Sequence, residues 1–285
     1  RSDYDFDTAA VFFQLDSSLS EKLTLETGLR VERRDTIYRD SELLGFSPTE
    51  TLWGGRVAAK YLLNSNTMAY ASIARGYKAG GFNTDGTLDA DLREFGEEFL
   101  VEYEMGIKSN LLENKLHLKA ALFHDDRHEQ QVKSSTGRIR ANGSTEFVDF
   151  IGNAAEGTNN GVEFEAVWTP SEQLGLTASL GLLDATFDSF VNSENQDLSG
   201  RDQAHAPGYM AHLAADYNLG AWSLSVSLDA KDEFYFSDSH NVQSDPYELL
   251  NMNLSYSGEQ WSLSFWGRNL TNQDYAVRGF FFGEF

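Results

Sequence analysis

The sequence predicts an all-β protein built from antiparallel strands, and three observations favour this class. Apolar and polar side chains alternate with a period of two along most of the chain, as a strand with one wet face requires. The connections between these segments alternate between short and long, and long runs of the chain lack helical periodicity. With 41% hydrophobic and 13% aromatic residues, the chain is too apolar to be disordered.

Charge and cysteine content exclude several classes of protein. The chain carries 22 Lys and Arg against 44 Asp and Glu, a net charge of −22, whereas a nucleic-acid partner requires a basic surface. The absence of cysteine removes disulfide scaffolds, thiolate zinc sites and cysteine nucleophiles. No stretch of 18 residues is free of charge, so no membrane-spanning helix is predicted. Residues 1–7 lack the features of a signal peptide, and we expect the chain to begin within a longer one.

The alternation predicts each strand in turn. In residues 221–231, the side chains of Trp222, Leu224, Val226, Leu228 and Ala230 share one face, and Ser, Asp and Lys side chains occupy the other. The same pattern predicts strands over residues 9–15, 23–31, 53–63, 67–77, 99–108, 116–122, 162–168, 174–182, 211–217, 250–256 and 261–267. The apolar face of these segments is therefore continuous from strand to strand.

The connections place short turns at one end of this sheet. Short turns are predicted at residues 17–21, 64–66, 112–114, 170–173, 218–221 and 257–260, and long connections at residues 40–50, 78–97, 131–146, 190–206, 237–247 and from residue 272. About twelve consecutive antiparallel strands with this asymmetry are typical of an outer-membrane barrel, which has short periplasmic turns and long external loops. The sequence therefore predicts an antiparallel transmembrane β-barrel.

The two faces of the sheet differ as a barrel wall requires. Aromatic residues of the apolar face lie close to the short turns, at Tyr61, Trp168, Tyr217, Trp222, Tyr256 and Trp261. Such rings prefer the membrane–water boundary and predict an aromatic girdle. The opposite face is charged, which predicts a lumen filled with water or a polar plug. Arg75 interrupts the apolar face, and we expect it to lie beyond the hydrocarbon or to follow a β-bulge.

Four segments in order resemble the C-terminal barrel of TonB-dependent outer-membrane receptors, the iron-siderophore-receptor branch in particular. They read YASIARGYKAGGFN at residues 70–83, EYEMGIKS at 102–109, NAAEG followed by GVEFEAVW at 153–157 and 161–168, and WGRNLTNQDY followed by AVRGFFF at 266–282. Together they extend the resemblance over essentially all 285 residues.

The resemblance implies an outer-membrane receptor of a Gram-negative bacterium that imports a ferric siderophore with energy from the TonB complex. Such receptors resemble a 22-stranded barrel closed by an N-terminal plug that carries the TonB box. Residues 1–285 would then be a partial barrel domain holding about the tenth to the twenty-first strand, without the plug and the first strands. A last strand is expected after Phe285. Residues 279–285 do not alternate cleanly, which disfavours Phe285 as a genuine aromatic terminus.

No catalytic, metal or cofactor site is predicted. His124, Asp125, Asp126 and His128 form a compact cluster that we expect at a strand end entering an external loop. In an extended strand the two histidines would lie about 13 Å apart, too far to share one ion. Gly80 and Gly81 precede no predicted helix, so they form a loop and not a phosphate cradle. We expect a receptor and not an enzyme.

The long loops are the expected place for ligand specificity, although the sequence singles out no binding residue. Residues 78–97 contain Phe82, Asp85, Asp89, Asp91 and Arg93, and residues 237–247 contain His240, Asn241 and Gln243, preceded by Tyr235 and Phe236. Aromatic and polar groups at a barrel mouth suit a ligand such as a ferric siderophore. The expected partners are this ligand, the TonB complex through the plug, and outer-membrane lipid.

Other functions remain open at this stage. A receptor of the same architecture can import carbohydrate, cobalamin or haem, and labelled candidates in an uptake assay distinguish them. A passive porin or a membrane enzyme would require closure by about twelve strands, and a porin would show single-channel conductance. A soluble β-sandwich would stay in solution without detergent, whereas the continuous apolar face predicts aggregation.

Overall fold

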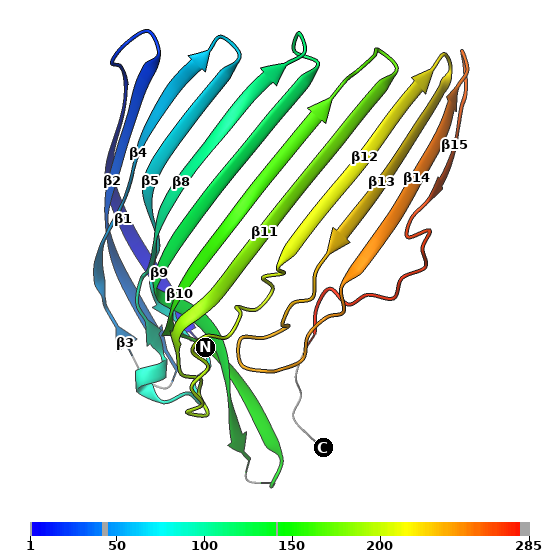
Figure 1. Ribbon diagram of the computed structural model, residues 1–285. Coiled ribbons are helices and arrows are strands. Elements are labelled where there is room, and N and C mark those ends of the chain that lie inside the picture. The colour runs from blue at the N-terminus through cyan, green and yellow to red at the C-terminus, as the bar shows by residue number, and fades with distance from the viewer. Residues whose placement is uncertain (1, 42–44, 141, 280–285) are drawn as a thin grey trace.

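The computed structural model describes residues 2–41, 45–140 and 142–279. One 13-stranded antiparallel sheet contains nearly all of this chain, and Figure 1 shows it curving as a wall. Its long strands follow in chain order as β1 (Ser2–Ser18), β2 (Leu23–Asp40), β4 (Thr49–Asn64), β5 (Thr67–Lys78), β8 (Glu98–Leu111), β9 (Leu116–Ile139), β10 (Thr145–Trp168), β11 (Leu174–Phe190), β12 (Tyr209–Leu219), β13 (Trp222–Lys231), β14 (Tyr247–Ser257) and β15 (Ser262–Gly267). The predicted strands are all present.

Four short elements lie between the long strands. Strand β3 (Gly45–Phe46) pairs with β2, while β6 (Gly81–Phe82) and β7 (Glu94–Phe95) form a small hairpin around the 3-10 helix η1 (Ala90–Leu92). No helix in the described ranges has the length and apolar character needed to cross a membrane. Short turns lie at the top of Figure 1, and the long connections lie at the opposite end.

The pairing register places the apolar residues of every long strand on one face. Leu213 pairs with Leu228 and Ala215 with Val226, so the apolar rows of β12 and β13 coincide. Large apolar side chains on this face remain exposed, for example Ile73 at 54% and Met105 at 58%. Within the described part of the chain no second layer covers them, because each long strand packs against its neighbours in the sheet. Lipid is the environment that such a face requires.

The predicted aromatic girdle is present beside the short turns. The Trp222 and Tyr256 rings lie 4.9 Å apart, and Trp261 lies 5.1 Å from Tyr256. These rings are amphipathic and stay partly exposed, with Trp222 at 48% and Trp261 at 59%. The girdle marks a membrane–water boundary, and the short turns beside it identify this end of the wall as the periplasmic end.

The long connection predicted at residues 131–146 is wrong. Strand β9 continues to Ile139 and β10 begins at Thr145, so the two strands form a hairpin that projects beyond the other loops in Figure 1. The hairpin packs against the connection at residues 78–97, because Val148 and Phe150 form a small core with Leu88. Outside the bilayer a strand needs no continuous apolar row, and for that reason the sequence pattern did not reveal this extension.

No bulge in β5 precedes Arg75, and the register shift between β4 and β5 lies in β4 at the short turn, between Leu62 and Asn64. The register of β5 with β8 is continuous, and Arg75 pairs with Val101 on the apolar face. Its guanidinium lies 4.3 Å from the ring centre of Trp53 and 4.2 Å from that of Phe99. Arg75 lies eight residues from Thr67, the residue at which β5 leaves the short turn. For a strand tilted by roughly 40°, this separation is about 20 Å along the barrel axis. The apolar band of such a barrel is about 25 Å tall. The residue therefore lies near the outer edge of the band, where a cation reaches water.

Candidate ligand-binding mouth

The long connections fold back over the external end of the wall. We call residues 78–98, 191–208 and 232–246 together the external mouth. Its aromatic and polar side chains come from segments far apart in the sequence. Buried and part-buried hydrogen bonds hold the first two segments against β2, β9 and β10. The mouth is therefore a built structure and not a set of free loops.

Arg93 fixes the first of these connections. The side chain is fully buried, at 0% exposure, and its guanidinium forms an ion pair with Asp40. It also donates to the Tyr38 hydroxyl at 2.7 Å and to the Asn83 carbonyl at 2.8 Å. Breaking a buried ion pair from one side leaves an uncompensated charge, so this contact ties the 78–98 segment to the external end of β2.

Phe82 lies in a cluster of four rings beside this ion pair. Its ring stacks on Tyr38 at 4.9 Å, and the rings of Phe46 and Tyr4 each lie 5.8 Å away. Asp85 accepts from the backbone N–H of Thr87 at 2.9 Å and from its hydroxyl at 2.6 Å. These hydrogen bonds lower the pKa of Asp85. Two of the candidate side chains thus hold the loop in shape.

The remaining candidates of this loop differ in their surroundings. Asp89 and Asp91 flank or lie in η1 and are exposed. Neither forms an ion pair with any described residue. They are therefore free to act on an approaching solute, whereas Phe82, Asp85 and Arg93 are occupied by the fold.

Arg201 organises the second half of the mouth. Its guanidinium lies 3.8 Å from the ring centre of Tyr235 and donates to the side-chain oxygen of Asn241 at 2.6 Å. It also donates to the backbone carbonyls of Ser237 and His240. Asn241 and the His240 backbone, both in the predicted 237–247 loop, thus contact an arginine that sequence reasoning did not select.

An aromatic group lies next to Arg201. Phe234 is 2% exposed, and its ring lies 5.4 Å from His205 and 5.5 Å from Phe236. Asp238 accepts from the backbone N–H of Ala204 at 2.8 Å, and burial raises the pKa of its carboxyl group. Gln243 meets Tyr235 in an isolated backbone bridge and its side chain is exposed. The predicted loop residues therefore lie together around Arg201 and Phe234.

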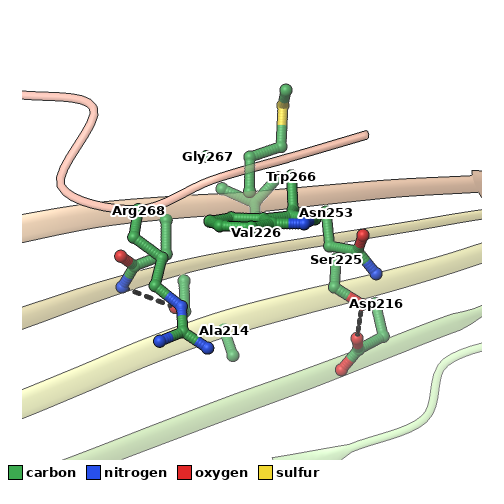
Figure 2. Close-up of a pocket in the computed structure, with 11 residues that line it drawn as sticks. Ala214, Asp216, Ser225, Val226, Asn253, Trp266, Gly267 and Arg268 are labelled. Carbon is green, nitrogen blue, oxygen red and sulfur yellow. Dashed lines mark hydrogen bonds between the residues drawn. The ribbon is translucent and has the colours of Figure 1, made fainter. Parts of the chain in front are cut away.

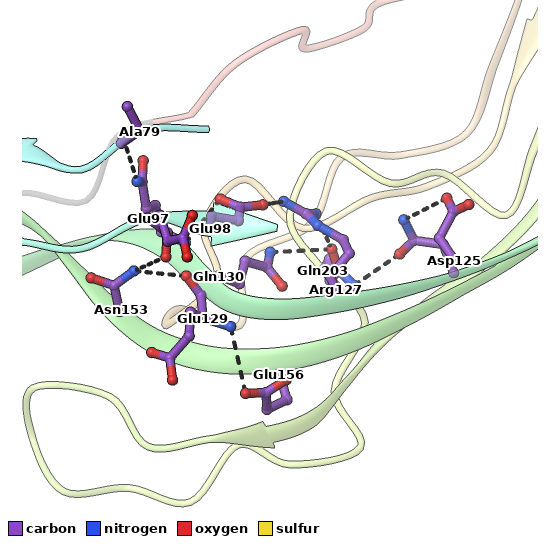
Figure 3. Close-up of polar contacts among 12 residues, drawn as sticks. Ala79, Glu97, Glu98, Asp125, Arg127, Glu129, Gln130, Asn153, Glu156 and Gln203 are labelled. Carbon is purple, nitrogen blue, oxygen red and sulfur yellow. Dashed lines mark hydrogen bonds and ion pairs between the residues drawn. The ribbon is translucent and has the colours of Figure 1, made fainter. Parts of the chain in front are cut away.

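A polar network joins the two halves of the mouth through the wall (Figure 3). Arg127 of β9 forms an ion pair with Glu98 at 2.5 Å and donates to Gln203 at 2.9 Å. Gln203 in turn donates to Asn159 of β10 at 3.0 Å. Gly157 leaves room for this contact, since a Cβ at that position would lie 2.9 Å from the Gln203 amide nitrogen. No motif marks these residues in the sequence, because only the strand register brings them together.

The histidine cluster predicted at a strand end lies within β9, so that placement is wrong. His124 contacts Asn160 at 2.8 Å and Asp126 at 3.1 Å, while His128 pairs with Glu156 at 2.8 Å. Asp125 falls on the opposite face, because side chains alternate along the strand. Over the ranges that the structure covers, no group of three His, Cys, Asp or Glu side chains converges to hold a metal ion.

The inner wall below the mouth is polar, as predicted. Lys119 and Glu165 form an ion pair at 2.9 Å, and His212 pairs with Asp229 at 2.7 Å. Figure 2 shows a shallow hollow near β15 in which the Trp266 ring lies across the wall. The register places Trp266 in the same row as Asn253, Ser225 and Asp216, so this exposed ring is on the polar face. Sequence reasoning did not single it out.

A curved antiparallel wall with a lipid-facing apolar side, a polar inner side and folded external loops defines the barrel of an outer-membrane receptor. Residues 1–270 match the family model for the TonB dependent receptor-like β-barrel, and the chain belongs to this family. The predicted resemblance and the fold class are thereby confirmed. Barrels of this family lie in the outer membrane of Gram-negative bacteria, which confirms the predicted location.

Individual relatives are distant. The pesticin receptor of Yersinia pestis is 23% identical over 289 residues, which cover 98% of this chain and 41% of that protein. The crystal structure of the ferric yersiniabactin uptake receptor FyuA from Yersinia pestis superposes with a TM-score of 0.81 at 20% identity, covering 99% of this chain and 43% of that one. The siderophore receptor PiuA from Acinetobacter baumannii gives a TM-score of 0.76 at 16% identity, with 96% and 40% coverage.

These structural likenesses show the fold. The chain spans less than half the length of the relatives that it matches. The wall and its external loops therefore account for one part of such a receptor.

Proposed function

We propose that the protein containing these residues is an outer-membrane receptor that imports a ferric siderophore with energy from the TonB complex. Residues 1–285 act in it as a partial barrel domain, and the plug with its TonB box belongs to the remainder. The protein binds and transports its ligand and performs no catalysis. Family membership supports the receptor class, and the similarity to FyuA, a ferric yersiniabactin uptake receptor, and to PiuA, a siderophore receptor, supports the siderophore.

The observation that carries this proposal is the preorganised external mouth. A buried ion pair at Arg93 and the Arg127 network hold aromatic and polar groups at fixed positions over a polar lumen. Preorganisation lowers the entropic cost of binding a small ligand, and a passive pore gains nothing from it.

Uptake of labelled iron tests the proposal directly. The full-length receptor is expressed in a Gram-negative strain that lacks its own siderophore receptors and is starved of iron. We expect uptake of at least one ferric chelate, and loss of this uptake in the same strain without TonB. Uptake that persists without TonB would indicate a passive pore, and uptake of haem, cobalamin or carbohydrate in place of iron chelates would identify another cargo.

A further inference from the structure

The external mouth is strongly acidic and its carboxylates are largely unneutralised. Exposed carboxylates of the mouth without an ion-pair partner among the described residues are Asp85, Asp89, Asp91, Glu94, Glu194, Asp197, Asp202, Glu233 and Asp245. They come from all three segments of the mouth. A solute approaching the barrel from outside therefore meets a negative potential.

The cations of the mouth do not offset this charge. Its segments contain Lys78, Arg93 and Arg201. Arg93 is buried against Asp40, and Arg201 is stacked on Tyr235 with its N–H groups directed to Asn241 and to carbonyl oxygens. Lys78 is exposed, and it alone among these three remains accessible to an anion.

Some buried side-chain atoms in and beside the mouth have no hydrogen-bond partner. Within the described residues these atoms are four oxygens, on Glu97, Asp125, Gln130 and Gln131, and two nitrogens, on Arg93 and Arg201. Gln130 is only 6% exposed and lies in the network that joins the halves of the mouth (Figure 3). Buried acceptors need donors, which water or a ligand with N–H or O–H groups supplies.

We infer that the mouth selects ferric chelates of zero or positive net charge and rejects strongly anionic ones. This inference rests on the proposed function and names the class of its cargo. Three singly charged hydroxamate groups neutralise Fe³⁺ and give a neutral complex. Three doubly charged catecholate groups leave a net charge of −3, which the unpaired carboxylates repel. A neutral chelate that carries both hydrogen-bond donors and acceptors also suits the unpartnered oxygens and nitrogens.

Equilibrium binding to the purified full-length receptor tests this selection. The two probes are a ferric trihydroxamate and a ferric tricatecholate of similar size. We expect the tricatecholate to bind about tenfold more weakly, or worse, at physiological ionic strength. Added salt should narrow this difference, because screening weakens repulsion and leaves the affinity for the neutral complex nearly unchanged.

Charge reversal tests whether the carboxylates of the mouth cause this difference in affinity. The double substitution Asp89→Lys and Asp91→Lys should raise the affinity for the trianion about threefold and leave that for the neutral chelate unchanged. Asp89 caps η1 without a side-chain hydrogen bond, so its substitution removes no capping contact. A second pair, Glu233→Lys with Asp245→Lys, repeats the test in another loop. The matched control, Glu172→Lys with Glu259→Lys, changes net charge equally at the periplasmic turns and should have no effect.

Each result has one meaning. The charge selection is overturned if the tricatecholate binds more tightly. It is also overturned if the two chelates bind equally and neither salt nor charge reversal changes their affinities. Both outcomes leave the proposed siderophore function intact. If the receptor takes up neither chelate and imports another nutrient, the proposed function itself fails. Preference for the neutral chelate, with a trianion affinity that responds to both mouth variants and not to the control, supports the inference.

Discussion

At the scale of single residues, burial decides what a charged side chain does. Arg93 and Asp91 lie two positions apart, yet Arg93 is fully buried in an ion pair while Asp91 is exposed. The sequence presented both as candidate ligand contacts, because residue type and loop position were all it offered. Only the packing of the loop on Tyr38 and Asp40 separates a structural charge from an accessible one.

Arg93→Ala should release the 78–98 segment. The substitution leaves the carboxylate of Asp40 buried without its cation, and the expected local cost is about 3–5 kcal/mol. Hydrogen exchange of the backbone amides in this segment measures the effect. Arg33→Ala is the matched control, because its ion pair with Asp35 is exposed to solvent and should contribute little to stability. Equal protection in both variants would contradict the role of Arg93.

Asp238 should make the loop at residues 232–246 sensitive to pH. Burial raises the pKa of this carboxyl group, so the folded loop favours the protonated form. Its contribution to stability is present below the ordinary pKa of aspartate, about 4, and is lost as pH rises through the raised value. Proteolysis of the loop followed from about pH 4 to pH 7 should accelerate with pH.

Two comparisons check the assignment to Asp238. In Asp238→Asn the acceleration with pH should disappear, because the amide oxygen still accepts from the Ala204 N–H and no charge forms. The turn at Asp85 should behave in the opposite way. Hydrogen bonds to Thr87 lower the pKa of Asp85, so its contribution is present at neutral pH and is lost as pH falls through the lowered value.

At the scale of elements, the bilayer determines which parts of the strands can be predicted from the sequence. Lipid imposes strict alternation on residues such as those of 211–217 and 222–230, and the sequence predicts these strands correctly. Above the bilayer the pattern relaxes, so the external part of the β9–β10 hairpin was predicted as a loop. The Glu98–Arg127–Gln203 network could not be predicted at all, because it depends on contacts across several strands and loops.

Phe150→Ala should loosen the projecting hairpin. Phe150 is 9% exposed and packs with Val148 and Leu88, and removal of a buried phenylalanine ring costs about 3–5 kcal/mol. Limited proteolysis should then cut the hairpin and the 78–98 segment faster, while the strands within the membrane stay protected. Phe147→Ala is the control, since that side chain is 49% exposed. Unchanged cleavage in Phe150→Ala would show that the hairpin does not depend on this core.

At the scale of the whole molecule, stability depends on lipid covering one face of the wall. Leu213 is 53% exposed on the apolar face, and Ala214 follows it on the polar face. Leu213→Arg should destabilise the refolded receptor by about 2–4 kcal/mol, because it places a charge near the middle of the bilayer. Ala214→Arg should cost far less. Urea unfolding in lipid vesicles measures both, and equal costs would contradict the assignment of the faces.

The guanidinium held between Trp53 and Phe99 has a consequence for how deeply the receptor sits in its membrane. Sinking inward would drag the Arg75 cation into hydrocarbon, and rising outward would lift two large rings into water. Both displacements are unfavourable, so these three side chains fix the depth at which the wall lies in the bilayer. The external mouth therefore stays at a constant height above the membrane surface.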